Sequence, residues 1–478
     1  MTLYNTLTRR KEPLKPVKEG RIGIYACGPT VYDYFHIGNA RIFILFDVLR
    51  RYLVYRGYQV TFVQNFTDID DKMIAKAAKL GISVTELAER FIRAYREDAA
   101  VLGILPADYH PRATEHIPQI IALVQKLMAK NYAYEIDGDV YFRVEAFPAY
   151  GQLSYQDLEE LNLGARVEID VRKKHPMDFA LWKKEKPGEP SWESPWSRGR
   201  PGWHIECSAM SMHYLGETLD IHAGGQDLIF PHHENEIAQS EGATGKTFAR
   251  HWVHAGYLNI DQEKMSKSLG NVLTIKELQE TVDPLVLRFF MLSAHYRTPI
   301  NFSEEHLQQA AKALERLHTL VYNLEDGLQR AEEDFHNDKE EKTWRTYLDE
   351  YRKKFIEAMD DDFNTAGAFA VLFELAREAN IYLNRPERPQ RKILELILKF
   401  YRETDKIFGF LKKHPKEIGL EEEITALIAS REEARRRKDW ALADSIREQL
   451  REKGILLEDT PQGVRWKVLT EKGTEEEV

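Results

Sequence analysis

Residues 21–39 read RIGIYACGPTVYDYFHIGN, and the predicted fold depends on this stretch. Its first six residues form an apolar run that is typical of a buried strand. Residues 40–55 have the composition of a helix, so the HIGN segment at 36–39 lies where a strand has ended and a helix begins. The backbone N–H groups and the dipole at a helix N-terminus attract anions. The stretch therefore predicts an anion site beside a sheet.

Strand and helix signals alternate on both sides of a long interruption. Residues 60–63 are β-branched and apolar, 71–80 and 84–101 are helical in composition, and alternation resumes at 219–227, a helix near Pro231 and 252–256. The interruption, 116–200, contains a helix at 117–129, a hairpin within 132–142 and a segment rich in Pro and Trp. This order predicts an α/β fold, a Rossmann-like doubly wound parallel sheet with an insertion and a site at its switch point.

Beyond Asp283 the chain is helical in character, with amphipathic runs at 307–324, 348–359 and 369–383, and a compact piece spans 421–467. We expect a helical bundle and then a small C-terminal α+β domain. The predicted divisions are 1–115 (first half of the Rossmann domain), 116–200 (connective insertion), 201–305 (second half), 306–412 (helical bundle) and 413–478 (C-terminal domain).

Composition narrows the function classes. The 478 residues are 43% hydrophobic and 30% charged, with no apolar run of membrane-spanning length and no secretion signal, so we expect a cytoplasmic protein without a membrane partner. The net charge of −10 argues against a protein that coats nucleic acid indiscriminately. Only two cysteines occur, Cys27 and Cys207, and their separation indicates a role other than a disulfide.

A second motif, KMSKS at 264–268, follows the resumed alternation. Its two ammonium groups suit a polyphosphate such as the triphosphate of ATP, in agreement with the anion site predicted at HIGN. A solvated basic loop is the alternative for two isolated lysines, and the presence of His36 and Asn39 disfavours it.

Three further blocks accompany these motifs: NFTDIDDK at 65–72, GWHIECSAM at 202–210 and FPHHENE at 230–236. Together with YACGPTVYD at 25–33 and KMSKS, they make the chain resemble the class I aminoacyl-tRNA synthetases, specifically their cysteine-specific family, over nearly its full length. One difference is Asn39, which stands where the name-giving motif of the class has a second histidine.

The resemblance implies a two-step reaction: the carboxylate of L-cysteine attacks the α-phosphorus of ATP to give cysteinyl-adenylate and pyrophosphate, and the acyl group then passes to the 3′-terminal adenosine of tRNA(Cys). The implied catalytic residues are His36, Asn39, Lys264 and Lys267. The implied ATP-binding residues are these four with Thr30, Asp227 and Ser268. The implied amino-acid-binding residues are Gly28, Thr67, Trp203 and His222. For Asp227 the alternative is a helix N-cap, and for Trp203 it is core packing.

Cys27, Cys207, His232 and Glu236 offer two thiolates, an imidazole and a carboxylate. Spacing leaves His232 and His233 equally suitable, and each cysteine alone is more often a small buried apolar residue. The resemblance selects His232 and implies one Zn²⁺ per chain, bound by these four residues beside the nucleotide site. It also implies that zinc binds the substrate thiolate and so excludes serine. Mg²⁺ is expected to arrive with ATP, because no carboxylate cluster resembles a dedicated site.

The C-terminal piece carries basic and aromatic residues that suit unstacked tRNA bases: Arg435, Arg436, Arg437, Trp440 and Trp466. A solvated helix face is the alternative for the arginines. Two rival functions are a ligase that joins cysteine to an aminosugar in mycothiol synthesis, and a catalytically silent tRNA-binding protein. The C-terminal piece disfavours the first, and the set of His36, Lys264 and Lys267 disfavours the second. The family implies a monomer.

Overall fold

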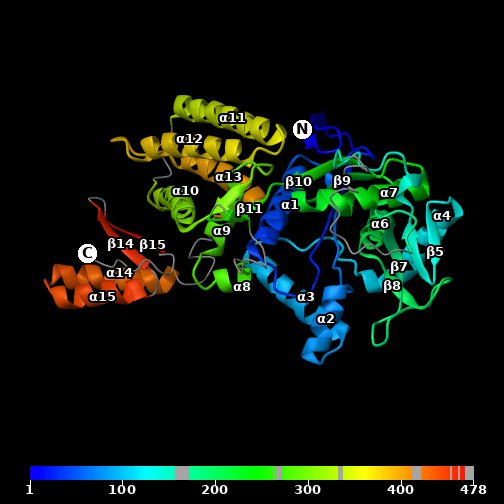
Figure 1. The fold of residues 1–478 in the computed structure, drawn as a ribbon. Helices are drawn as coiled ribbons and strands as arrows, with labels where there is room; N and C mark the ends of the chain where they lie inside the picture. Colours follow the sequence, from blue (N-terminus) through cyan, green and yellow to red (C-terminus); the bar gives the residue numbers. More distant parts are fainter. Residues whose placement is uncertain are drawn as a thin grey trace. The chain divides into compact units, whose positions relative to one another are not determined.

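The computed structural model describes residues 1–156, 172–261, 263–264, 272–331, 337–411, 421–452, 455–460 and 463–468 (Figure 1). The chain divides into two compact units. The first comprises Met1–Glu280, Phe290–His306 and Ile356–Ala368, and the second comprises Thr281–Phe289, Leu307–Phe355 and Phe369–Val478.

A four-stranded parallel sheet lies at the centre of the first unit. Its strands are β3 (Arg21–Ala26), β4 (Gln59–Gln64), β9 (Leu219–Gly225) and β10 (Ala249–Ala255), in the order β10-β9-β3-β4. The register pairs Ile24 with Phe62 on one side and with Ile221 on the other. Strands distant in sequence, β3 and β9, are therefore neighbours, and their carboxyl ends form the switch point where doubly wound sheets bind ligands. This arrangement confirms the predicted fold class.

Side-chain caps explain where α1, α2 and α3 begin. The helix α1 (Ile37–Tyr55) starts three residues before the predicted 40, because the Nδ1 atom of His36 accepts the N–H of Asn39 at 3.3 Å. Asp70 caps α2 (Asp71–Leu80) and Ser83 caps α3 (Val84–Val101), both with the predicted bounds. The described part of the chain also forms α4 (Ile117–Ala129), α6 (Trp203–Leu215), α7 (Glu234–Thr244) and the short α8 (Ile275–Leu278).

The insertion folds into a four-stranded antiparallel sheet of β5 (Ala133–Ile136), β6 (Asp139–Phe142), β7 (Phe179–Lys184) and β8 (Gly199–Pro201). Fully buried Phe142 and Trp182 belong to the same apolar cluster as Leu127 of α4 and Tyr25 of the central sheet. A shared core of this kind holds the insertion against the parallel sheet by removing continuous apolar area from water.

Several short elements carry too few residues to show a periodic pattern, and the sequence did not predict them. They are the N-terminal hairpin β1 (Thr2–Asn5) and β2 (Arg10–Pro13), and a small sheet of β11 (Leu258–Ile260), β12 (Glu263–Lys264) and β13 (Ile300–Phe302). Short helical turns lie at Ala113–Glu115, Val144–Ala146, Gln226–Leu228 and Ile229–His233.

The second unit is mainly helical, as predicted. After α9 (Pro284–Leu292), which spans the division between the units, come α10 (Glu304–Arg330), α11 (Asp338–Asp360), α12 (Thr365–Leu383) and α13 (Arg391–Phe408). The chain then forms α14 (Glu421–Arg436), α15 (Trp440–Glu452) and an antiparallel hairpin of β14 (Ile455–Thr460) and β15 (Gly463–Val468). Ile424, Leu450 and Leu457 join these last elements in a small core. Within the described residues, no helix has both the length and the apolar character of a membrane span.

Candidate functional site

The carboxyl ends of β3 and β9 bring together residues that are far apart in the chain. Cys27 directly follows β3, and its N–H donates to the carbonyl of Ala223 in β9 at 3.1 Å. Cys207 lies on α6, His232 in the turn before α7 and Glu236 in the first turn of α7. The parallel strand order therefore builds the candidate metal centre next to the segment that leads into HIGN.

All four predicted metal ligands are buried, and one ligand atom from each lies within 4.8 Å of the others. The His232 Nε2 atom is 3.0 Å from the Glu236 Oε1 atom. His232 falls in the group with both cysteines, whereas His233 falls in a different group. Two sulfurs, one nitrogen and one oxygen are a donor set that zinc accepts in a tetrahedral site, so these residues fit the ion.

Charge is already separated within this cluster. A hydrogen bond with Cys27 lowers the pKa of Cys207 to about 6 against the effect of burial, whereas burial raises the pKa of Cys27 well above its usual range. Burial alone would raise the pKa of Glu236, yet His222 and His232 lower it to about 2. Burial opposes protonation of His232, but Glu236 and Cys207 raise its pKa to about 10. A metal cation that replaces these protons finds anionic ligands in position.

Two of the predicted amino-acid-binding residues, His222 and Trp203, lie against members of the metal cluster, and Gly28 directly follows Cys27. The Gly28 N–H donates to the Asn65 Oδ1 atom at 2.9 Å, and a Cβ atom at Gly28 would lie 1.7 Å from the Asn65 carbonyl oxygen, so only glycine fits. Thr30 pairs with Thr67 in an isolated parallel bridge, which joins the segment after Cys27 to the segment after β4. His222 is fully buried, with its Nε2 atom 2.8 Å from the Glu236 Oε2 atom.

Trp203 is 42% exposed, and its ring centroid lies 4.4 Å from that of His232. Core packing, the alternative for this residue, is therefore wrong. The indole instead forms an accessible wall beside a predicted metal ligand, where a small substrate could contact it.

The predicted nucleotide residues lie at the start of α1 and after β9. Because Nδ1 of His36 accepts a backbone N–H, its ring proton resides on Nε2, which can donate to an anion. Asp227 lies inside the turn Gln226–Leu228, and the capping position there is Gly225, which makes no side-chain cap. The helix N-cap interpretation of Asp227 is therefore wrong. Lys264 belongs to β12, but its side chain, Lys267 and Ser268 lie outside the described residues.

The segment after KMSKS pairs with the HIGN segment, a contact that sequence reasoning missed. The Ile37 N–H donates to the Leu273 carbonyl at 2.9 Å, and the Ile275 N–H donates to the Phe35 carbonyl at 3.2 Å. A capping box between Thr274 and Glu277 begins α8 at this point. The S/T-x-x-E spacing of this box was the one local signal available.

Sequence reasoning also missed histidines that support the cluster. The His204 Nδ1 atom is 2.9 Å from the His232 Nδ1 atom, and the His254 Nε2 atom is 2.8 Å from the His233 Nδ1 atom. Burial lowers the pKa of His254 to about 3, so its ring is neutral at physiological pH. Single histidines on separate elements produce no spacing pattern, and no local signal could have found them.

The predicted tRNA residues belong to the small C-terminal part. Arg435 and Arg436 end α14, and the guanidinium groups of Arg436 and Arg437 lie 3.6 and 2.8 Å from the carboxylate of Glu433. Trp440 begins α15 and is 59% exposed. Trp466 lies in β15, with its side chain outside the described residues. These positions are compatible with RNA binding and with a solvated helix end.

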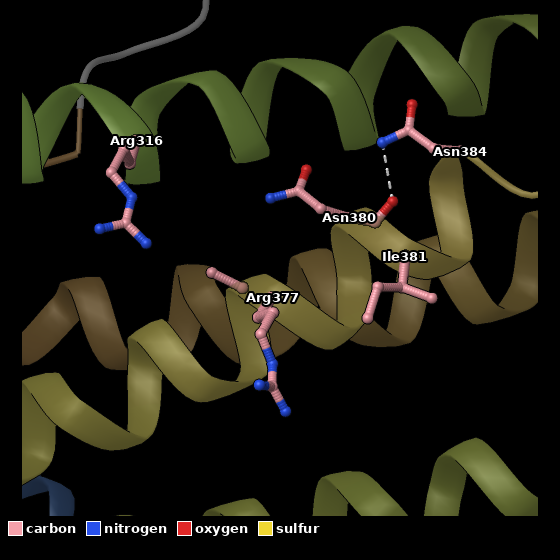
Figure 2. Close-up of a pocket in the computed structure, with 6 residues that line it drawn as sticks. Arg316, Arg377, Asn380, Ile381 and Asn384 are labelled. Carbon is pink, nitrogen blue, oxygen red and sulfur yellow. Dashed lines mark hydrogen bonds between the residues drawn. The ribbon is translucent and has the colours of Figure 1, made fainter.

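A groove of about 360 Å³ lies between α10 and α12 of the helical unit (Figure 2). Its lining residues are Arg316, Ala376, Arg377, Asn380, Ile381 and Asn384. Arg377 is paired with Glu378 at 3.0 Å, and the Asn384 amide donates to the Asn380 carbonyl at 2.9 Å. The lining offers neither a carboxylate nor a thiol, so the groove has no acid–base or nucleophilic chemistry of its own.

Comparisons with known proteins identify the family. The family described as tRNA synthetases class I (C) catalytic domain matches residues 13–312, the DALR domain matches 354–412, and the cysteinyl-tRNA ligase anticodon binding domain matches 418–466. The chain is 56% identical to the cysteine–tRNA ligase of Geobacillus thermodenitrificans (strain NG80-2) over 97% of its own length and 98% of that protein. It is 55% identical to the cysteine–tRNA ligase of Geobacillus sp. (strain WCH70) over the same shares.

Among solved structures, the methionyl-tRNA synthetase of Mycobacterium tuberculosis in complex with methionyl-adenylate is similar in fold, with a TM-score of 0.62 and 15% identity. The match covers 81% of this chain and 92% of that one. The order of the motifs, the parallel sheet with its buried ligand cluster and the full-length similarity all lead to one assignment. The chain belongs to the cysteine–tRNA ligase family of class I tRNA synthetases.

Proposed function

We propose that this protein activates L-cysteine with ATP and transfers the cysteinyl group to the 3′-terminal adenosine of tRNA(Cys). One observation carries the proposal: Cys27, which directly follows β3, lies in a buried cluster with Cys207, His232 and Glu236, and the chain continues from Cys27 to the start of α1 at HIGN. The full-length identity of 56% to a cysteine–tRNA ligase supports the same reaction.

In the first step, a carboxylate oxygen of cysteine forms a bond to the α-phosphorus as the bond to the bridging oxygen of pyrophosphate breaks. The protein contributes position and charge, because the nucleophile and the leaving group both belong to the substrates. The Nε2–H of His36 is suited to donate to an α-phosphate oxygen. We assign Asn39, Thr30 and Asp227 to the nucleoside and α-phosphate, and Lys264, Lys267 and Ser268 to the β- and γ-phosphates, with Mg²⁺ entering on ATP.

Cys27, Cys207, His232 and Glu236 would hold one Zn²⁺. When bound, zinc supplies a soft Lewis acid that binds a thiolate far more strongly than a serine hydroxyl. A pocket that judged size alone would separate two such similar side chains by only about 1–3 kcal/mol. Gly28, Thr67, Trp203 and His222 would bind the ammonium and carboxylate groups of the same substrate.

The C-terminal match at 418–466 favours tRNA over an aminosugar as the acyl acceptor, because that region resembles an anticodon-binding domain. Within it, Arg435, Arg436, Arg437, Trp440 and Trp466 are the residues that we assign to tRNA. The division into 1–115, 116–200, 201–305, 306–412 and 413–478 remains our proposal for the functional parts, as does a monomer that works in the cytoplasm.

Two assays test the function. Cysteine-dependent exchange of pyrophosphate into ATP tests activation, and charging of tRNA(Cys) against an aminosugar acceptor tests the acceptor. We expect exchange with cysteine, at most trace exchange with serine, and acylation of tRNA alone. Exchange that serine supports as well as cysteine does would contradict the proposed role of the cluster, and acylation of the aminosugar would replace the proposed acceptor.

A further inference from the structure

A second group of potential metal ligands adjoins the buried cluster and overlaps with it. Cys27, His222, His233 and Glu236 are all buried, and one ligand atom from each lies within 4.8 Å of the others. This group shares Cys27 and Glu236 with the cluster described above. It replaces Cys207 and His232 with two other histidines.

We propose that Cys27, His222, His233 and Glu236 form a second, alternative position for a divalent transition metal. One sulfur, two imidazole nitrogens and one carboxylate oxygen are donors that Zn²⁺ and Co²⁺ both accept in a four-coordinate site. Nothing in the assignment of the family requires this second position. It follows from where the side chains lie.

The two shared ligands face both groups. The Oε1 atom of Glu236 lies 3.0 Å from Nε2 of His232, and its Oε2 atom lies 2.8 Å from Nε2 of His222. The Sγ atom of Cys27 lies 3.2 Å from Nε2 of His233. A metal ion can therefore move from one group to the other while Cys27 and Glu236 remain bound.

Hydrogen bonds hold His233 in its orientation, whereas Nδ1 of His222 has no hydrogen-bond partner among the described residues. The Nδ1 atom of His233 is 2.8 Å from Nε2 of His254, whose Nδ1 atom is 2.8 Å from the hydroxyl of Thr6, so Nε2 of His233 is directed toward the sulfur. Hydrogen bonding of the second ring nitrogen is the usual way in which proteins orient a metal-binding histidine.

Packing adds to this orientation. The absence of a side chain at Gly224 makes room for His233, since a Cβ atom there would lie 2.7 Å from its Cε1 atom. The ring of His222 stacks on Trp252, with a centroid distance of 4.5 Å. Both imidazoles are therefore fixed before any ion enters, which lowers the entropic cost of binding.

Because two ligands are shared, a metal with all four ligands occupies one position at a time. The group with two thiolates is the stronger one for a soft ion, so the second position fills when Cys207 is lost. A metal ion in the second position also occupies His222, which the proposed function assigns to the substrate. A protein without Cys207 is therefore expected to bind the metal ion but not to activate cysteine. This last consequence rests on the proposed function, whereas the second position itself does not.

The full-length Cys207→Ala variant, stripped with a chelator and titrated with Co²⁺, tests the second position. We expect one Co²⁺ per chain, bound about 10- to 100-fold more weakly than in the wild type. The sulfur-to-cobalt charge-transfer band should have about half the wild-type intensity, because one thiolate remains of two. X-ray absorption should show two imidazole nitrogens in the first shell.

Second substitutions identify the ligands. Cys207→Ala with His233→Ala should bind Co²⁺ at least about tenfold more weakly than Cys207→Ala alone. Cys207→Ala with His213→Ala is the matched control, because His213 lies exposed on the same helix as Cys207, and it should bind like the single variant. Near-UV circular dichroism of each stripped protein checks that it is folded.

The proposal is overturned if folded Cys207→Ala binds no Co²⁺, if its cobalt shows no thiolate band, or if loss of His233 leaves binding unchanged. Failure of the proposed function is a separate result: wild-type protein loaded with zinc would show no cysteine-dependent pyrophosphate exchange, whatever the cobalt titrations of the variant show.

Discussion

Glu234 should hold the insertion against the sheet, and its replacement by glutamine provides a quantitative test. The side chain is fully buried at the first position of α7. Its carboxylate accepts the backbone N–H groups of Gly151 at 2.9 Å, Leu153 at 3.1 Å and Ser154 at 2.8 Å, and also the Ser154 hydroxyl at 2.9 Å. One carboxylate therefore accepts the hydrogen bonds of all these donors in a single turn of the insertion.

The expected cost comes from an unpaired donor and not from the lost charge. Burial raises the pKa of Glu234 by more than its hydrogen bonds lower it, so the charge itself gives no net stabilisation. Glutamine keeps one oxygen and presents an amide N–H₂ group in place of the other, so at least one buried N–H loses its acceptor. A buried unsatisfied donor costs about 1–3 kcal/mol, and we take about 2 kcal/mol for Glu234→Gln.

Hydrogen exchange at pH 8 measures this locally, without an assumption that the whole chain unfolds in one step. A loss of about 2 kcal/mol should accelerate exchange of the Gly151, Leu153 and Ser154 amides about 30-fold. Glu241→Gln on the same helix is the matched control. Glu241 accepts the N–H of Phe248 at 3.0 Å, and glutamine keeps that bond through its carbonyl oxygen. Equal exchange rates in the two variants would refute the reasoning.

Three further changes should have distinct effects. Gly28→Ala should reduce cysteine-dependent pyrophosphate exchange at least about 100-fold, because its methyl group would meet the backbone of Asn65; activity within about threefold of wild type would show that the pocket can adapt. Burial raises the pKa of Asp98 to about 6, above about 3.9 in the unfolded chain, so Asp98 lowers stability as pH rises through this window. Asp98→Asn should therefore raise the free energy of unfolding at pH 7.5 by on the order of 1 kcal/mol, measured by urea unfolding. If the variant were instead more stable than wild type at pH 3.5 and not at pH 7.5, the predicted effect of the Asp98 charge would have the wrong sign. Arg41→Leu should lower the free energy of unfolding by about 3 kcal/mol in the same assay, because the guanidinium donates to the backbone carbonyls of residues 256, 257, 296 and 298. A decrease of less than about 1 kcal/mol would mean that those carbonyls find other donors.

Helix positions were predictable where the causes lie within a few residues. Asp70 and Ser83 cap α2 and α3, and Gly81 ends α2 in a left-handed conformation, so the predicted and observed bounds agree. The start of α1 was misplaced because its cap is a histidine, a residue type that capping preferences do not favour. The short strands β1, β2 and β11 escaped prediction since three or four residues cannot establish a period of two.

The alternation of strands and helices could be predicted from the sequence, and so could the turn at HIGN that we propose to bind an anion. The resemblance of five motif blocks also identified the family. Local hydrogen bonds and hydrophobic periodicity carry this information, and both act over a few residues. Which side chains meet could be seen only once the strands were placed in the folded unit. The neighbouring positions of β3 and β9 bring Cys27 to Glu236 and add His222, His233 and His254, each from a separate element or turn. Contacts of this kind depend on strand order and on packing of the whole unit, so no local pattern encodes them.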